Sequence, residues 1–303
     1  MGRISEDQAS CQNITFGPIW LTISATLFAI VAVMVRLAGL QGISGSETTF
    51  VRFMFGLASV GLLHKFGIAQ MHFYRKWLLA ARGITGGVAI LFYYLSLASV
   101  KGPGQTPLTN SVLLGNSYFI FTPIFGALLI KERLRFGTIL AVVAALIGLY
   151  LVIQPNFSHI RTGDIYGLAA GVISGLAIVI IRELRKTESA ISIFFSFCVF
   201  GALAGLIGML FEGAVLPNFY GWLVLLVMGI ASTAGQLSMT YALRWSRAGE
   251  AGIIQMTTVI YSSIAGILWL GDPFNWMILL GAIIVFSSAI YISIVQNLQV
   301  AEK

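Results

Sequence analysis

The stretch that decides the fold is residues 120–152, IFTPIFGALLIKERLRFGTILAVVAALIGLYLV, in which two apolar runs meet at a short charged turn. The turn is KERLR, residues 131–135. Each run, with the residues that flank it, is long enough to cross a bilayer, because a transmembrane helix needs about 20 apolar residues. The stretch therefore predicts two transmembrane helices joined by a tight turn.

The same pattern returns 140 residues later, at 260–292, IYSSIAGILWLGDPFNWMILLGAIIVFSSAIYI. The two segments align without a gap, and Glu132 in the first turn falls on Asp272 in the second. A repeat at a fixed offset indicates a chain built from two similar halves. The alternative is that the two segments resemble each other only because both are apolar.

Composition excludes a soluble domain. Of the 303 residues, 58% are hydrophobic and 10% are charged, and the mean hydropathy is +0.92. A soluble protein carries about 25% charged residues. The net charge of +7 raises the question of nucleic-acid binding. The basic residues lie in short loops between apolar runs, however, so we interpret them as signals of membrane orientation and predict no nucleic-acid partner.

Ten apolar runs follow one another along the chain. They cover about 17–40, 46–66, 77–99, 107–130, 135–153, 163–183, 189–211, 220–243, 249–271 and 274–296. Runs of this length are helices, because backbone groups in lipid must be satisfied within their own segment. Strands of a membrane barrel would be half as long and would alternate in polarity. The sequence predicts an all-α membrane protein with ten transmembrane helices.

Lysine and arginine are distributed unevenly between the two sets of loops. With the N-terminus in the cytoplasm, the inner loops hold 13 of these residues and the outer loops hold 2. Cytoplasmic loops are enriched in Lys and Arg. We therefore predict a multi-pass integral membrane protein with both termini in the cytoplasm, in the inner membrane if the source is bacterial.

Five crossings per half make the second half inverted relative to the first, as in many secondary transporters. We predict a cytoplasmic N-terminal segment at 1–16, a first repeat at 17–153 and an external linker at 154–162. A second repeat at 163–296 and a cytoplasmic tail at 297–303 complete the chain.

Several motifs, spread over nearly the whole chain, carry a family resemblance. They are Glu47-x4-Arg52-Phe53, Arg82, Phe92-Tyr93-Tyr94-Leu95, Thr122-Pro123-Ile124-Phe125 and Lys131-Glu132-Arg133-Leu134. Together with the repeat, they resemble the EamA-type ten-helix branch of the drug/metabolite transporter superfamily. The second half departs from the pattern, with Ser262-Ser263 where an apolar-Pro pair is usual and Gly271-Asp272-Pro273 where Gly-Glu is usual.

The resemblance implies a metabolite carrier that works by alternating access, with a central cavity between the two repeats. The third, fourth, eighth and ninth helices would line this cavity, with parts of the first and sixth. The expected partners are a small-molecule metabolite and the lipid bilayer. Ten helices can enclose a cavity within one chain, so a monomer is sufficient.

Arginines inside the apolar runs need an explanation, because a charge in the bilayer costs about 2.5 kcal/mol or more on insertion scales. Arg52 could dock a substrate carboxylate, or it could form a structural ion pair with Glu47 or reach the outer interface. Arg36, near the outer end of the first run, could face the cavity or reach outward to the interface. We interpret Arg82 as an anchor at the basic inner interface.

Two acids, Glu47 and Glu250, are candidates for proton coupling. Glu250 could instead complement the dipole at the start of the run 249–271. Glu132 and Asp272 lie in turns and are interpreted as turn and capping residues.

Uncharged polar residues are the better candidates for substrate binding. We select Asn116, Gln236, Gln255, Tyr94, Tyr241 and Thr258. Asn116 lies near mid-depth, where an amide needs partners, and the runs 107–130 and 249–271 are repeat mates whose polar faces could meet. The alternative is interhelical hydrogen bonding, worth about 0.6 kcal/mol for each pair.

We predict a secondary transporter of a small polar metabolite: an amino acid, an organic anion or a zwitterion. The alternative is proton-coupled efflux of amphipathic or cationic drugs, which usually needs an acid embedded in the membrane. The sequence has no Gly-rich phosphate loop, no His-Glu-x-x-His motif and no Cys/His cluster. We therefore predict that the protein is not an enzyme and that it uses no metal and no cofactor.

Overall fold

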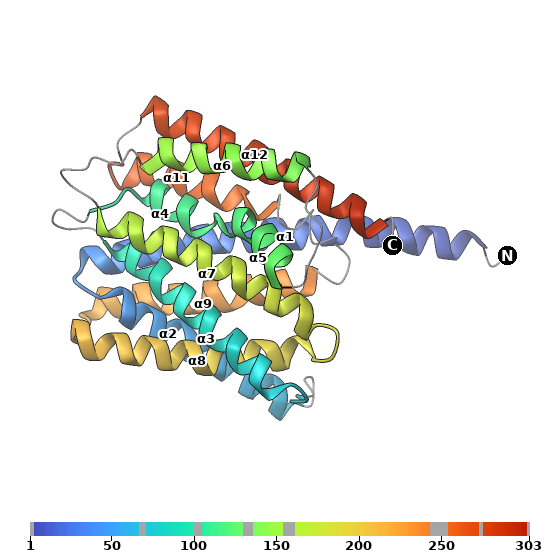
Figure 1. The fold of residues 1–303 in the computed structure, drawn as a ribbon. Helices are drawn as coiled ribbons and strands as arrows, with labels where there is room; N and C mark the ends of the chain where they lie inside the picture. The colour runs from blue at the N-terminus through green and yellow to red at the C-terminus, as the bar shows by residue number, and fades with distance from the viewer. Residues whose placement is uncertain are drawn as a thin grey trace.

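The computed structural model describes residues 3–66, 71–99, 105–129, 136–153, 161–242, 254–272 and 275–301. Within these residues every regular element is a helix, as the apolar runs predict. The helices are α1 (Arg3–Leu40), α2 (Gly45–Lys65), α3 (Lys76–Ala98), α4 (Leu108–Gly115), α5 (Tyr118–Leu129), α6 (Phe136–Ile153), α7 (Thr162–Leu184), α8 (Ala190–Glu212), α9 (Phe219–Ala242), α11 (Thr257–Trp269) and α12 (Trp276–Ala301) (Figure 1). The predicted all-α membrane fold is confirmed.

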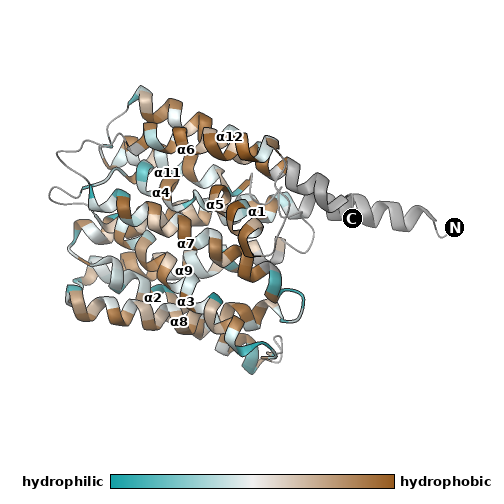
Figure 2. Cartoon of the chain, viewed as in Figure 1, coloured by the Kyte–Doolittle hydropathy of each residue, from teal (hydrophilic) through white to brown (hydrophobic). Residues whose placement is uncertain are grey.

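Six of the described segments are long and apolar enough to cross a membrane. They are Gly17–Leu40, Lys76–Ala98, Leu108–Leu129, Thr162–Ile181, Ala190–Glu212 and Phe219–Met239. Helices α6, α11 and α12 contribute shorter apolar stretches, and α2 is more polar because it buries Glu47, Arg52 and several hydroxyl groups. Figure 2 shows hydrophobic residues along most of the helices and hydrophilic residues gathered at turns and helix ends. The chain is therefore a multi-pass integral membrane protein.

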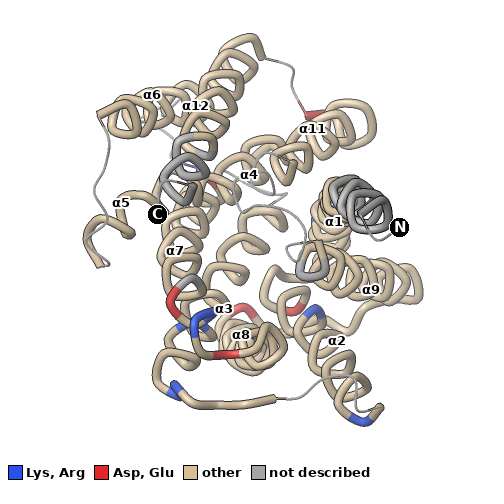
Figure 3. Tube along the Cα trace, turned by 90° about the vertical axis from the view of Figure 1, so that its right-hand side faces the viewer, with Lys and Arg blue, Asp and Glu red and all other residues tan. Residues whose placement is uncertain are grey.

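The helices of the two halves pack on one another in a symmetric pattern. Helix α3 packs on α7 and α1 packs on α9, and these two contacts exchange when the halves are exchanged. Helix α2 packs on its repeat mate α8, and α6 packs on its repeat mate α12. Figures 1 and 3 place the α6–α12 pair on one side of the bundle and the α2–α8 pair on the other. Helices α1 and α7, which open the two repeats, run in opposite directions in Figure 1, as an inverted repeat requires.

Two glycines allow the backbones of α6 and α12 to touch. A Cβ added to Gly148 would lie 2.8 Å from the carbonyl oxygen of Gly281. A Cβ added to Gly281 would lie 2.6 Å from the carbonyl oxygen of Gly148. Small residues permit this close approach of membrane helices, whose association depends on packing rather than on a hydrophobic driving force.

The fourth span is broken near its middle. The sequence predicts one helix over 107–130, but α4 ends at Gly115 and α5 begins at Tyr118. At the break, Nδ2 of Asn116 donates to the carbonyl of Val112 at 2.8 Å, and Oγ of Ser117 donates to the carbonyl of Leu114 at 2.6 Å. These side chains take up carbonyl groups near a break in the helical ladder, which an apolar side chain could not do.

The second repeat is interrupted at the equivalent position. Met256, 140 residues after Asn116, is a turn residue between helical residues 254–255 and the start of α11. Met256 precedes α11 without a side-chain cap. Both repeats therefore contain a discontinuous helix, a feature that secondary transporters place at their binding sites.

Candidate functional site

A cavity of about 230 Å³ lies between the two repeats. Its walls come from α1, α2, α3, α4 and α5 in the first half and from α7, α8, α9 and α11 in the second, with Gln255 just before α11. Arg82 lies six residues, about 9 Å, from the start of α3, and Met239 lies three residues from the end of α9. Helix α3 begins, and α9 ends, at the end of the bundle where α1 begins and α12 ends (Figure 1). The cavity therefore extends toward this end, which we call the terminal end.

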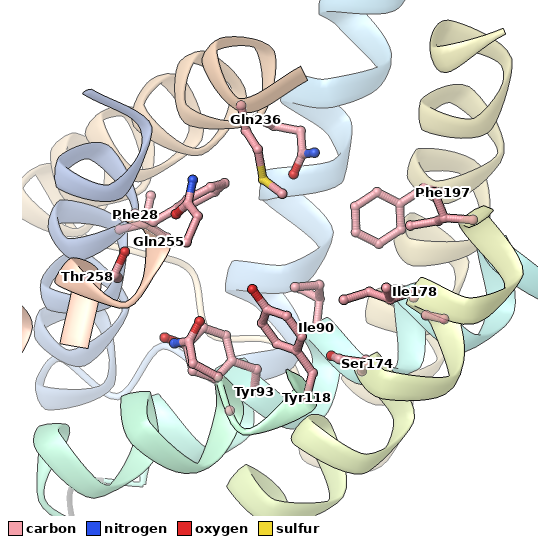
Figure 4. A pocket seen from close by; sticks show the side chains of 18 of the residues that line it. Phe28, Ile90, Tyr93, Tyr118, Ser174, Ile178, Phe197, Gln236, Gln255 and Thr258 are labelled. Atoms are coloured by element: carbon pink, nitrogen blue, oxygen red, sulfur yellow. The ribbon is translucent and has the colours of Figure 1, made fainter. Parts of the chain in front are cut away.

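Five of the residues selected from the sequence line this cavity. They are Arg52, Asn116, Gln236, Gln255 and Thr258. In Figure 4, Gln236 and Gln255 lie across the space from Tyr93 and Tyr118. Residues from four separate helical segments of the sequence thus meet at one place.

Arg52 is held by aromatic neighbours. Its Nη1 donates to the hydroxyl of Tyr94 at 3.0 Å, and its Cζ lies 5.4 Å from the centre of the Tyr94 ring and 5.6 Å from that of Phe53. The Tyr94 hydroxyl also lies 3.9 Å from Sδ of Met228. Cation–π contacts and the hydroxyl stabilise the buried charge of Arg52. Tyr94 is fully buried and is absent from the described lining of the cavity. It therefore holds Arg52 in position and does not itself face the cavity.

Glu47 has two backbone donors at the start of α2. Its Oε2 accepts from the amide of Ser44 at 3.1 Å, and Ser44 Oγ accepts in return from the amide of Glu47 at 3.1 Å. This is a capping box. Oε1 of Glu47 accepts from the amide of Val215 at 3.0 Å, which ties α2 to the connection between α8 and α9. The carboxylate expected to pair with Arg52 or to carry a proton is thus engaged by backbone groups.

Arg36 is buried and is absent from the described lining of the cavity; the sequence left open whether it faces the cavity or reaches the outer interface. Its Nη1 donates to the carbonyl of Ser99 at 3.0 Å, and its Nη2 donates to the carbonyl of Thr106. These two residues flank the connection between α3 and α4 at the far end of the bundle. The guanidinium stays inside the protein because carbonyl groups are available there, and Arg36 braces this connection.

Gln255 and Thr258 also join helices. Nε2 of Gln255 donates to Oγ of Ser24 at 2.9 Å, and Ser24 donates to the carbonyl of Gly235 at 2.8 Å. Oγ1 of Thr258 donates to the carbonyl of Ala25 at 3.1 Å. These bonds connect α11 and the residues before it with α1 and α9, so both residues combine interhelical bonding with a place in the cavity wall.

Asp272 caps a helix other than its own. Its Oδ2 accepts from the backbone amide of Thr109 at 3.2 Å, in the first turn of α4. The capping role expected from the turn is present, but it joins the second repeat to the first. The other acid of the repeated turn, Glu132, lies outside the described residues, as does Glu250. The side chain of Tyr241 is likewise outside the described part of the chain.

Sequence reasoning missed part of the cavity wall. Arg82, expected at the inner interface, lines the cavity together with Gly86, Ala89 and Tyr93. These residues are spaced i, i+4, i+7 and i+11, so they share one face of α3. That spacing is the signal that could have placed Arg82 in the cavity. Phe197 on α8 and Tyr118 on α5 complete the wall, and Figure 4 shows the Phe197 ring projecting toward the space.

The two helix breaks contribute equivalent positions to the wall. Gly115 and Tyr118 of the first repeat correspond, at the offset of 140, to Gln255 and Thr258 of the second, and all four line the cavity. Helices α5 and α11 both begin here. A helix N-terminus carries a partial positive charge. At the first break the C-terminus of α4, which carries the opposite partial charge, lies beside the start of α5. The pseudo-symmetry therefore brings the two breaks to one cavity without a net positive charge from the helix ends.

The charge of the cavity wall is positive. Arg52 and Arg82 are its two arginines, and its described lining includes no Asp or Glu. Elsewhere in the described part of the chain, no group of three His, Cys, Asp or Glu side chains could hold a metal ion. The remaining lining is mainly aliphatic and aromatic, as in most small-molecule sites.

Comparison with known proteins finds a matching family model and several related transporters. The family model described as EamA-like transporter family matches residues 15–154 and 161–294. An uncharacterized transporter of Helicobacter pylori (strain ATCC 700392 / 26695) is 25% identical over 272 residues, covering 86% of this chain and 89% of the relative. The pseudopaline exporter CntI of Pseudomonas aeruginosa (strain UCBPP-PA14) is 20% identical, covering 91% and 95%. Solute carrier family 35 member G1 of Homo sapiens is 22% identical, covering 94% and 80%.

A solved crystal structure has the same fold, with a TM-score of 0.63 at 16% identity, covering 91% of this chain and 96% of the other. The family and these relatives are transporters and not enzymes. The matched residues span both repeats and nearly the whole chain. This chain belongs to the EamA-like transporter family.

Proposed function

We propose that this protein is a secondary transporter that moves a small organic anion across the membrane by alternating access. The observation that carries the proposal is the cavity between the repeats, lined by Arg52 and Arg82 and by no acid among its described residues. A charge in a site of low dielectric is stabilised mainly by opposite charges and hydrogen bonds. Among the substrate classes expected from the sequence, the cavity therefore favours the organic anion.

The polar groups of the wall suit a substrate with a second polar function. Asn116, Gln236, Gln255 and Thr258 provide amide and hydroxyl groups near the two helix breaks. A few well-placed polar groups in a mainly apolar pocket orient a small ligand. The proposed binding set is these four residues with the two arginines.

The alternating-access proposal is supported by where the cavity ends. Beyond Tyr93, toward the far end of the bundle, Tyr94, Leu97 and Leu108 are fully buried and fill the space between the helices. The cavity lies on the terminal side of this packing. We assign the structure to the state that is closed at the far end, and the inverted repeat supplies an equivalent arrangement closed at the terminal end. With both termini in the cytoplasm, this state faces the cytoplasm.

Efflux of cationic drugs has less support from the structure. It usually needs an acid in the transport path; Glu47 is engaged as a helix cap by backbone donors, and Glu250 lies outside the described residues. The name of one relative, pseudopaline exporter, makes export the direction to test first. The described cavity wall favours an anion in either direction.

Transport can be tested with the purified chain in proteoliposomes loaded with a mixture of aromatic and aliphatic carboxylates, amino acids and tertiary amines. Compounds released to the outside are measured by mass spectrometry, without ATP. We expect carboxylates to be released faster than from liposomes without protein. Two matched variants test whether transport uses the cavity. Ala177→Trp places a large side chain in the cavity. Val143→Trp, the control, makes the same kind of change at an exposed position on α6.

The outcomes separate the two functions. Release of carboxylates that is lost in Ala177→Trp and kept in Val143→Trp supports the proposal. Release of amines alone would establish cation efflux and overturn the anion assignment. Release of every compound at the same rate in Ala177→Trp and in the wild type would show that the cavity is not the transport path.

A further inference from the structure

Arg82 holds its guanidinium in a cradle formed by two neighbours. Its Cζ lies 4.4 Å from the centre of the Phe197 ring on α8. A Cβ built on Gly86, one turn further along α3, would collide with Nη1 of the arginine. The same Cβ would lie 2.9 Å from the Phe197 ring. The guanidinium therefore stacks on an aromatic face, in a space that exists because residue 86 has no side chain.

A stacked guanidinium keeps its in-plane N–H groups for another partner. Nε and Nη1 of Arg82 are buried and have no hydrogen-bond partner among the described residues. The residue as a whole is part-exposed and lines the cavity. These two nitrogens are covered by the protein itself, whereas Nη2 is not among the buried unpartnered atoms, so Nη2 is the donor left for a charge-assisted hydrogen bond to a carboxylate. Arg82 thus differs from Arg52, whose Nη1 already donates to Tyr94.

We propose that Arg82 is the residue that docks the carboxylate of the transported anion, with Phe197 and Gly86 orienting its guanidinium. This inference rests on the proposed function and deepens it by naming the substrate class: carboxylates with a compact apolar part next to the carboxyl group. The apolar body follows from the walls around the arginine. Ile178 and Ile181 line the same cavity on α7, which packs directly on α3.

The position of Arg82 along α3 assigns its step in transport. It precedes Tyr93 by 11 residues, about 16 Å along the helix, toward the terminal end. A substrate entering from that end meets Arg82 before it reaches the polar groups at the helix breaks. Docking at Arg82 is therefore the first contact of the carboxylate from the terminal side.

The test uses the full-length chain in detergent and a pair of probes that differ in charge but hardly in shape, phenylacetate and phenylacetamide. Their apparent affinities are read from the rise of the melting temperature with concentration. The variants are Arg82→Gln, Arg82→Lys and Gly86→Ala. The matched controls are Arg75→Gln, an exposed arginine near the same end, and Gly61→Ala, a helical glycine whose added Cβ would meet nothing within 4 Å.

We expect phenylacetate, and not phenylacetamide, to stabilise the wild type. Its apparent Kd rises about tenfold or more in Arg82→Gln, since a charge-assisted hydrogen bond and the positive charge are lost. Gly86→Ala has a similar effect, because the added methyl group moves the guanidinium out of its position. The positive charge of Arg82 itself is kept. Arg82→Lys binds at an intermediate strength, because an ammonium keeps the charge but loses the planar fork. Both controls bind as the wild type does.

Several results would overturn the assignment. Equal stabilisation of the wild type and of Arg82→Gln by phenylacetate would place the carboxylate elsewhere and leave anion transport standing. Stabilisation by both probes alike, or by neither, would remove the carboxylate role of Arg82. If phenyl phosphate binds in an Arg82-dependent way and phenylacetate does not, the substrate class is wrong. If Arg82→Gln does not fold, the affinity of Gly86→Ala for phenylacetate decides whether Arg82 docks the carboxylate. Failure of the proposed function is seen separately, as the absence of carboxylate release by wild-type proteoliposomes.

Discussion

The guanidinium of Arg52 and the hydroxyl of Tyr94 form a buried hydrogen bond of 3.0 Å that joins α2 to α3. Tyr94 is fully buried and Arg52 is 7% exposed. The bond lies where the cavity meets the packed far end of the bundle. It satisfies a charge that the bilayer would otherwise make costly, and it fixes the arginine relative to the cavity.

Tyr94→Phe is expected to destabilise the protein by about 1 to 3 kcal/mol, because the buried Arg52 loses an acceptor and gains none. The check is the free energy of unfolding in detergent. Tyr150→Phe is the control, since Tyr150 on α6 is exposed. Equal stability of the two variants would show that Arg52 does not depend on the hydroxyl.

Arg36→Gln is expected to lower the free energy of unfolding by about 2 kcal/mol or more, since two charge-assisted hydrogen bonds to the carbonyls of Ser99 and Thr106 disappear. Arg75→Gln removes an exposed arginine and should change stability by about 0.5 kcal/mol or less. Because Arg36 is absent from the described cavity wall, substrate affinity measured in the folded fraction should not change. A large loss of affinity without a loss of stability would return Arg36 to the binding site.

Gly281→Val is expected to separate α6 from α12 and to cost about 1 to 3 kcal/mol by overpacking. The reason is that the first atom of the new side chain would already lie 2.6 Å from the carbonyl oxygen of Gly148. The measurement is the melting temperature of the purified variant. Gly61→Val is the matched control, and a similar small effect in both variants would contradict the close packing of the two helices.

The pH dependence of stability should contain a contribution from Glu183, which lies two residues beyond the apolar span that ends at Ile181. Its carboxylate accepts from Nζ of Lys186 at 2.6 Å and from Nη1 of Arg75 at 3.1 Å. These bonds, that of Lys186 first, hold the pKa of Glu183 below its usual range. A depressed pKa stabilises the folded state above the unfolded pKa of about 4.3, and the contribution disappears as the pH falls through the folded pKa.

Glu183→Gln should therefore lower the melting temperature slightly at pH 7 and have no effect once the pH is below the folded pKa. The groups are exposed, so the difference should also shrink when salt is added. Melting curves across pH, at low and high salt, provide the check. The double variant with Arg75→Gln should show that part of the effect is shared, and a difference independent of pH would contradict the prediction.

The all-α fold, the two inverted repeats and the family were accessible from the sequence. Lipid offers the backbone no hydrogen bonds, so long apolar runs have one local solution, and a helix needs no knowledge of distant residues. The repeat of 120–152 at 260–292 is also a property of the sequence alone. The polar residues Asn116, Gln236 and Gln255 could be selected because few amides occur in such runs. Thr258, three residues after Gln255, lies on the same helix face.

The roles of the arginines were decided only by the tertiary structure. Arg36 and Arg82 are both cations in apolar helices; the sequence left open whether Arg36 faces the cavity and placed Arg82 at the inner interface. Arg36 meets two carbonyls at the α3–α4 connection, 63 and 70 residues away. Arg82 meets the cavity and the ring of Phe197, 115 residues away. The spacing of Arg82, Gly86, Ala89 and Tyr93 shows that they share one face of α3. Which distant helices pack against that face is decided only in the folded chain.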